Sequence, residues 1–292
     1  MRRLLAALAL GAVLAGCGGG DDSASLVERL PGDARALSAI DLAAVKERLG
    51  LPDDADPTRP PGDAGGEAQA RLFAYAGGAY PYVVRFDRVL MEAIDESRVT
   101  QAATTPVSGP DTVVVLATDQ PFDEEIASRL EGAGYRPDDG LLLNEEAGGP
   151  GGFAAVGGED GVVVLAGDAW AARRALDGGQ PGGPTRELLN EVDAPVRDAS
   201  SLSGGQTCVR GVALGDDIDP PELQMVVRVT GEAAADRVED PATDAGDAFR
   251  AGEPEAEGDL GRLPLSYTPR PGTTPIQALV ARLAAPYRCP GD

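Results

Sequence analysis

The sequence contains no histidine, a single lysine and few aromatic residues. Without histidine, Ser-His-Asp and Cys-His catalysis and an HExxH zinc site are excluded. Lys46 is not preceded by a serine three residues earlier, so a Ser-x-x-Lys nucleophile is absent too. P-loop, G-x-S-x-G and G-x-G-x-x-G motifs are also missing. These absences remove the commonest hydrolases and nucleotide-binding enzymes, and they favour a protein that is not an enzyme.

Positive charge is scarce as well. Lys and Arg total 25 against 48 Asp and Glu, which gives a net charge of −23. A nucleic-acid-binding protein needs a basic surface to displace counterions, so nucleic acid is excluded as a partner. The acidic clusters 53–56 and 216–219 lack the alternating oxygen ligands of a calcium loop, so no metal and no cofactor are expected. Aromatic residues make up 4% of the chain, too few to suggest a platform for stacking carbohydrate.

Long apolar runs are also lacking, and the best one lies at the start of the chain. Arg2 and Arg3 precede the apolar run 4–14, whose helical length of about 16 Å is too short for a hydrocarbon core of about 30 Å. A charged start followed by a short apolar run and small residues is typical of an export signal. The run ends in Leu14-Ala15-Gly16-Cys17, which resembles the lipobox of bacterial lipoproteins.

This resemblance implies that residues 1–16 are a lipoprotein signal peptide and that Cys17 carries diacylglycerol and an N-acyl chain. The mature protein would then be anchored by lipid at the extracytoplasmic face of the cell membrane. Two or three acyl chains make a stable anchor where one is marginal. The glycine-rich, polar stretch after Cys17 is predicted to be a flexible tether that reaches to about residue 29.

Cys208 and Cys289 are the two remaining cysteines. In an exported protein such a pair predicts a disulfide. It would close a loop of about 80 residues, worth about 4.5 kcal/mol on the chain-entropy model. Two separately buried thiols are the alternative.

The remaining pattern predicts an α+β fold in which a mixed or antiparallel sheet has flanking helices. We expect an α+β domain over 30–198 and a smaller α+β subdomain over 205–292, joined by the polar linker 198–207. Strands are expected near 36–40, 99–103, 113–117, 141–143, 153–156, 162–166, 208–214 and 223–229. Residues 232–259 read as a solvated acidic excursion, and Thr274 begins the last helix with a capping box.

An internal repeat is the clearest local signal. Gly109–Asp119 and Gly158–Asp168 agree at eight of eleven positions, 49 residues apart. Each reads as a turn, a buried strand and a helix start at Asp119 or Asp168. The two aspartates are predicted either to cap helices or, if their strands are neighbours, to form an acid/base pair or a hard-metal site.

The stretch 99–196 also resembles a domain of unknown function in exported bacterial proteins. The resemblance rests on Gly140-Leu-Leu-Leu, on the GEDGVVVLAGD segment, on the helix that follows it and on Leu188-Leu189. It implies no activity. Together these features predict a lipid-anchored envelope lipoprotein that acts as a non-catalytic interaction module for an envelope protein or polymer. A solute-binding lipoprotein for a transporter is the first alternative, and a carboxylate-dependent envelope hydrolase is the second.

Overall fold

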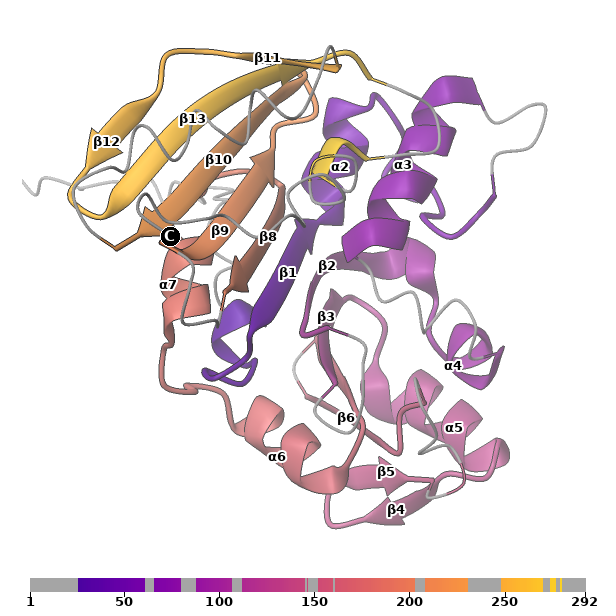
Figure 1. Cartoon of the computed structure of the whole chain (residues 1–292). Coiled ribbons are helices and arrows are strands. Elements are labelled where there is room, and N and C mark those ends of the chain that lie inside the picture. The colour runs from indigo at the N-terminus through magenta and orange to yellow at the C-terminus, as the bar shows by residue number, and fades with distance from the viewer. Residues whose placement is uncertain are drawn as a thin grey trace, which may run out of the picture.

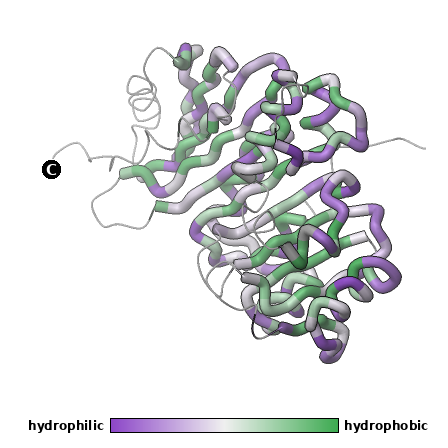
Figure 2. Tube along the Cα trace, turned by 90° about the vertical axis from the view of Figure 1, so that its right-hand side faces the viewer, coloured by the Kyte–Doolittle hydropathy of each residue, from purple (hydrophilic) through white to green (hydrophobic). Residues whose placement is uncertain are grey.

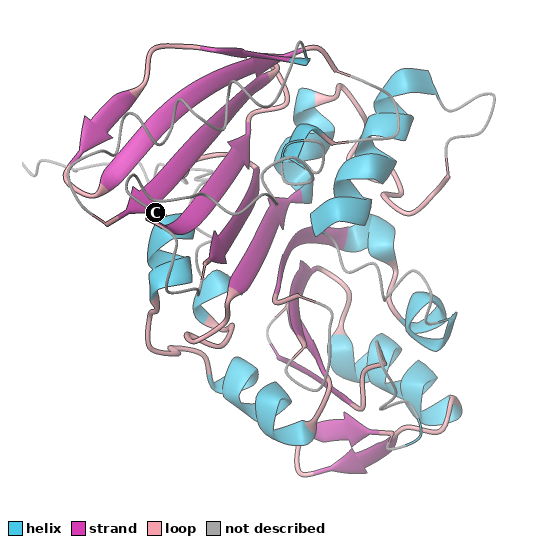
Figure 3. Cartoon of the chain, viewed as in Figure 1, coloured by secondary structure: helices cyan, strands magenta, loops and turns pink. Residues whose placement is uncertain are grey.

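A computed structural model describes most of the chain beyond the predicted tether. The predicted α+β class is confirmed, since helices surround one large antiparallel sheet (Figures 1 and 3). The described residues are 26–60, 66–79, 88–106, 112–144, 146, 152–159, 161–202, 208–230, 248–269, 274–276 and 279.

The sheet has thirteen strands, and each described strand pair is antiparallel. Its order is β11-β13-β10-β9-β8-β1-β2-β3-β7-β6-β5-β4, and β12 also pairs with β13. The strands are β1 (Ala36–Asp41), β2 (Val99–Thr104), β3 (Val113–Thr118), β4 (Arg136–Asp138), β5 (Leu141–Leu143), β6 (Ala155–Glu159), β7 (Val162–Ala166), β8 (Val196–Ser201), β9 (Val209–Asp216), β10 (Glu222–Val229), β11 (Phe249–Ala251), β12 (Glu255–Glu257) and β13 (Leu260–Tyr267).

Helices cover both faces of the sheet, so there are two apolar cores (Figure 1). The larger core lies beneath α2 (Leu42–Arg48), α3 (Gly66–Ala79), α4 (Arg88–Ala93), the π-helix η2 (Phe122–Ala127) and α5 (Ser128–Gly132). The smaller core lies beneath α6 (Ala169–Asp177) and α7 (Pro184–Leu189), together with the first described turn at Leu26 to Leu30. A short 3-10 helix, η1 (Glu96–Arg98), leads into β2. Figure 2 shows apolar residues concentrated along the central strands.

The two copies of the internal repeat pair with each other. Their strands β3 and β7 are adjacent and antiparallel, and Val115 lies opposite Val164. Successive side chains of a strand point to opposite faces; Val114 and Leu116 accordingly enter the larger core, whereas Val113 and Val115 enter the smaller one. A strand that is buried on both faces needs an apolar side chain at every position, which explains the unbroken apolar run in β3 and in β7.

The polar stretch predicted to be a linker is in part a central strand. Val196–Ser201 forms β8, which pairs with β1 on one side and β9 on the other. The linker prediction failed because Asp198 and the serines give no apolar alternation. In the sheet, the Asp198 carboxyl instead accepts a hydrogen bond from the Ser38 hydroxyl. The sheet therefore continues across the predicted boundary between residues 198 and 205, and the two predicted parts share it.

Other expectations fall partly or wholly outside the described residues. The acidic excursion includes two short strands, β11 and β12, although 231–247 lie outside the described part. Cys17 and Cys289 lie outside it too, whereas Cys208 is buried beside the start of β9. Lipidation and the Cys208–Cys289 disulfide therefore stay predictions. Among the described residues, no helix is both long and apolar enough to span a bilayer.

Two loops approach each other so closely that only glycine fits. A Cβ atom on Gly183 would lie 1.8 Å from the carbonyl oxygen of Gly32, and one on Gly32 would lie 1.8 Å from that of Pro181. These are backbone atoms, which cannot rotate away as a side chain can. The contact joins the segment before β1 to the loop between α6 and α7.

We therefore expect Gly183→Ala to lower the free energy of unfolding by about 1–3 kcal/mol, because the new methyl overpacks this contact. Gly182→Ala is the matched control, since a Cβ there meets no atom within 4 Å, and its effect should stay within about 0.5 kcal/mol. Urea denaturation of the two variants measures the difference. Equal stabilities would show that the two loops are not in this contact.

Candidate functional site

The one tryptophan of the chain lies on the surface. Trp170 is in the first turn of α6, and it is 65% exposed, the single large apolar side chain that is exposed among the described residues. Its neighbours Ala171, Ala172 and Ala175 face the smaller core and fix the helix against β6 and β7. A large exposed aromatic side chain on a well-packed helix is typical of a binding surface rather than of a core.

The Trp170 ring is held in place by an arginine one helical turn later. The Arg174 guanidinium carbon lies 4.5 Å from the ring centroid, within the range of a cation–π contact. Gln180 in turn holds Arg174, because its Nε2 donates to the Arg174 carbonyl oxygen at 2.7 Å and its Oε1 accepts from Arg174 Nη2. The indole is thereby ordered although it is exposed.

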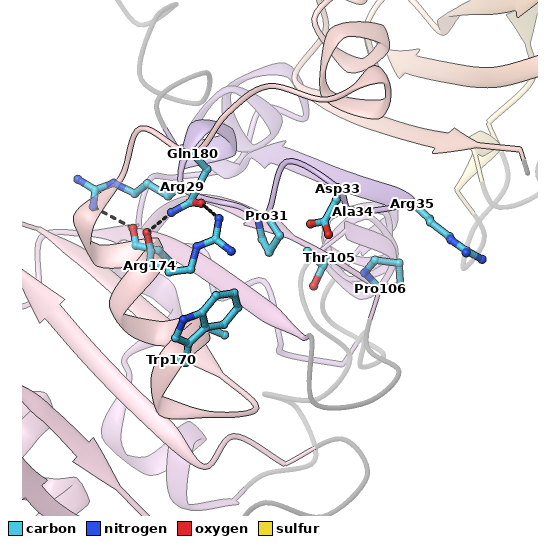
Figure 4. A pocket seen from close by; sticks show the side chains of 12 residues that line it. Arg29, Pro31, Asp33, Ala34, Arg35, Thr105, Pro106, Trp170, Arg174 and Gln180 are labelled. Atoms are coloured by element: carbon cyan, nitrogen blue, oxygen red, sulfur yellow. Dashed lines mark hydrogen bonds between the residues drawn. The ribbon is translucent and has the colours of Figure 1, made fainter.

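Trp170 borders a cleft of about 370 Å³, a volume within the range of small-molecule sites. Figure 4 shows Trp170 and Arg174 at one end and Arg35 at the other, with Pro31 between them. The lining combines apolar surface with charged and polar groups: Arg29, Pro31, Asp33, Ala34, Arg35, Thr105, Pro106, Trp170, Ala171, Arg174, Ala175 and Gln180.

The wall that precedes β1 is attached firmly to α6 and to the loop after it. Arg29 Nη1 donates to the carbonyl oxygens of Ala175 and Leu176 at 3.3 and 2.7 Å, which satisfies acceptors at the C-terminal end of α6. Arg186 donates to the carbonyl oxygen of Gln180 at 2.6 Å and to that of Leu30. The cleft is therefore formed by segments that are already fixed in the folded protein.

The predicted acidic pair, Asp119 and Asp168, is not brought together. Their strands are neighbours, as the pair requires, but they are antiparallel, so the aspartates follow opposite ends of β3 and β7. Five residue pairs lie between those ends, a length of about 17 Å. Asp168 caps α6 by accepting from Ala171 N at 2.8 Å, so its predicted capping role is confirmed. Asp119 caps no helix; it pairs with Arg98 at 2.6 Å.

The acidic clusters predicted to be loops have structural roles. Asp56 Oδ1 accepts from the backbone nitrogen of Thr58 at 2.8 Å, and the sole lysine, Lys46, donates to the Asp53 carbonyl oxygen at 2.7 Å. Arg48 similarly donates to the carbonyl oxygens of Asp217 and Asp219. No group of three metal-ligating side chains occurs among the residues that the structure describes.

Two carboxyls with raised pKa, the half-buried Asp198 and the buried Asp216, lie on the opposite face of the sheet from the cleft, and the sequence did not single them out as a pair. Asp216 is fully buried and accepts from the Tyr267 hydroxyl at 2.8 Å, and the Tyr75 hydroxyl lies 3.2 Å from that of Tyr267. Burial raises the pKa of Asp216, and it raises the pKa of Asp198 to about 6. The cavity beside Tyr75 and Tyr267 measures about 10 Å³, room for about one water molecule. It has no room for a substrate.

The fold and the site thus define an α+β protein with a continuous antiparallel sheet and an open, mixed apolar and cationic cleft. No family model matches the chain, and neither does the sequence of any curated protein. Among solved structures, crystal forms I, IV and III of TP0453 align with TM-scores of 0.43, 0.41 and 0.39 at 10% identity. They cover 88–89% of this chain and 96–97% of TP0453. Likeness at this level assigns no function.

The Trp170 cleft was not predicted. Its residues come from three segments that are distant in sequence, and the low aromatic content argued against a stacking platform. The available local signal was the spacing of Trp170 and Arg174, four residues apart on one helical face.

The raised pKa of Asp198 predicts that replacing this residue raises the free energy of unfolding by an amount that depends on pH. In the folded protein the pKa of Asp198 lies above its ordinary value of 3.8, so ionising this carboxyl disfavours folding. The destabilisation grows as the pH rises from about 4 to 6 and reaches its full size above about pH 6. Asp198→Asn keeps an acceptor for Ser38 and should raise the free energy of unfolding by about 1–3 kcal/mol at pH 7.5. The gain should disappear below about pH 4.

Urea denaturation from pH 3.5 to 8 measures this dependence. Asp54→Asn, at an exposed position, is the control and should change stability by less than about 0.5 kcal/mol at each pH. A destabilised Asp198→Asn at pH 7.5 would show that the carboxylate contributes favourably to folding.

Proposed function

We propose that the protein is a lipid-anchored lipoprotein at the extracytoplasmic face of the cell membrane, where it binds an envelope component without catalysis. The observation that carries the binding role is the ordered, 65% exposed Trp170 beside a cleft of about 370 Å³. Binding proteins need a preformed surface of this kind, whereas the cavity beside Tyr75 and Tyr267, next to the buried Asp216, measures about 10 Å³ and is too small for a substrate.

The predicted anchor would keep this cleft close to the membrane. Nine Cα-to-Cα steps separate Cys17 from Leu26, and they span at most about 32 Å when the chain is extended. Arg29, three residues further on, already lines the cleft. The wall of the cleft is therefore the first part of the folded protein that the tether reaches, so envelope components beside the membrane are within its range.

A solute-binding lipoprotein for a transporter is the second candidate, and the size of the cleft favours it. The two candidates differ in the ligand. A diffusible solute would bind the purified protein in solution without holding it on envelope material. An envelope component would retain the protein on that material. The two experiments below measure anchoring and retention separately.

Lipidation is tested by Cys17→Ser, with Ser23→Ala as the matched control. The Cys17 variant should leave the membrane fraction and keep an uncleaved, unlipidated N-terminus, because the thiol that carries the lipid is absent. Membrane fractionation and N-terminal mass spectrometry measure the two effects. Unchanged partitioning and mass would overturn the anchored part of the proposal.

Binding is tested by co-sedimentation of lipid-free Cys17→Ser protein with washed cell envelopes. We expect the protein to sediment, and Trp170→Ala in the same background to reduce the bound fraction at least about tenfold, equivalent to 1.4 kcal/mol. Arg250→Ala, at an exposed position on the edge strand β11, should have no effect. Equal sedimentation of all three proteins would show that the cleft is not the binding site.

A further inference from the structure

Two charged side chains in the Trp170 cleft have no partner in the described structure. Arg35 and Asp33 are both exposed, and neither side chain makes a hydrogen bond or ion pair with another described residue. By contrast, Gln180 and Arg174 bond each other, and Arg29 contacts the end of α6 and lies 3.6 Å from Glu159. Arg35 lies at the opposite end of the cleft from Trp170 and Arg174 (Figure 4), so a ligand on the indole meets the Asp33 carboxylate and the remaining donors of Arg174.

The charge of the cleft is opposite to that of the chain. Three arginines and one aspartate line it, whereas the protein as a whole carries −23. A guanidinium offers donors in a planar fork that fits a carboxylate or phosphate. Because the chain as a whole is acidic and this lining carries a net positive charge, an anionic ligand would find its favourable charge in the cleft, and a cationic ligand would be drawn elsewhere.

The Asp33 carboxylate restricts the ligand further. A purely aromatic or aliphatic anion would stack on Trp170 and pair with Arg174, but it would place no donor near Asp33 and would be repelled by it. A ligand that carries hydroxyl groups would donate to Asp33 and at the same time present an anion to Arg174. The flat C–H face of a sugar ring also suits an indole, whose apolar surface is broad and rigid.

We propose that the cleft binds an acidic saccharide, whose ring lies against Trp170, whose acid group pairs with Arg174 beside that indole, and whose hydroxyls donate to Asp33. This deepens the proposed binding function and rests on it, because the saccharide is then the recognised part of the envelope component. The volume of about 370 Å³ accommodates one or two sugar rings. The low aromatic content of the chain does not oppose this proposal, because a single well-placed indole is sufficient as a platform.

Trp170 reports on its own site, because it is the only tryptophan in the chain. The intact protein is titrated with glucuronate, galacturonate and N-acetylmuramate, and with the methyl ester of each, while tryptophan emission is followed. At least one acid should change the emission with a Kd of about 1 mM or below, and its ester should bind at least about tenfold more weakly, a difference of 1.4 kcal/mol. Polymers that contain the responding sugar then distinguish a polymer-bound unit from the free sugar.

Three variants locate the response. Arg174→Gln should weaken binding of the acid at least about tenfold and should weaken binding of the ester less. Asp33→Asn should weaken acid and ester alike. Arg250→Ala, on β11 at the far end of the sheet from β4, should change neither. Circular dichroism spectra that match the original protein confirm that each variant is folded.

The proposal is overturned if none of the acids changes the emission up to about 20 mM, where a 1 mM site is nearly saturated. It is also overturned if the esters bind as tightly as the acids, or if naphthalene-2-sulfonate binds more tightly than every sugar. The last outcome would assign the cleft to aromatic anions. If the sugars fail to bind but sedimentation on envelopes still depends on Trp170, the saccharide proposal is wrong and the proposed binding function stands. The two experiments therefore distinguish failure of the saccharide proposal from failure of the proposed function.

Discussion

The antiparallel pairing of β3 with β7 is the contact on which the rest of the structure depends. Both strands are apolar on both faces, so each face must be covered by helices, and the sheet acquires two cores instead of one. The helix that follows β7 covers the smaller core, and its Asp168 cap fixes where that helix begins. Trp170 lies in its first turn and is therefore placed by the sheet itself.

Because Trp170 lies on the surface, the protein forgoes the folding free energy that a buried indole would contribute. An exposed indole contributes little to folding, yet Arg174, Gln180 and the loop contact at Gly183 hold its surroundings in one arrangement. Such order reduces the conformational entropy that the protein would lose when a ligand binds. The carboxyls of Asp198 and Asp216, whose pKa values are raised, are a separate feature and lie on the other face of the sheet, away from the cleft.

The sequence was most informative where apolar periodicity and capping agreed. Strand β7 and the Asp168 cap of helix α6 were predicted nearly to the residue, because apolar pattern and cap coincide there. Strand β8 was missed because polar residues form it and its neighbours supply the burial. The acidic pair failed on strand direction, which residue spacing alone does not encode. The cleft was beyond prediction because its arginines, prolines and tryptophan meet only in the folded chain.

The central claim is that the Trp170 cleft is occupied where the protein works. Chemical labelling of tryptophan in intact cells, compared with the purified protein, tests it most directly, because each modified indole reports on residue 170 alone. Protection of Trp170 in cells, and ready labelling after purification, is the result that a cleft bound to an envelope component predicts. Equal labelling in both states, at equal protein concentration and with the fold intact, would contradict it.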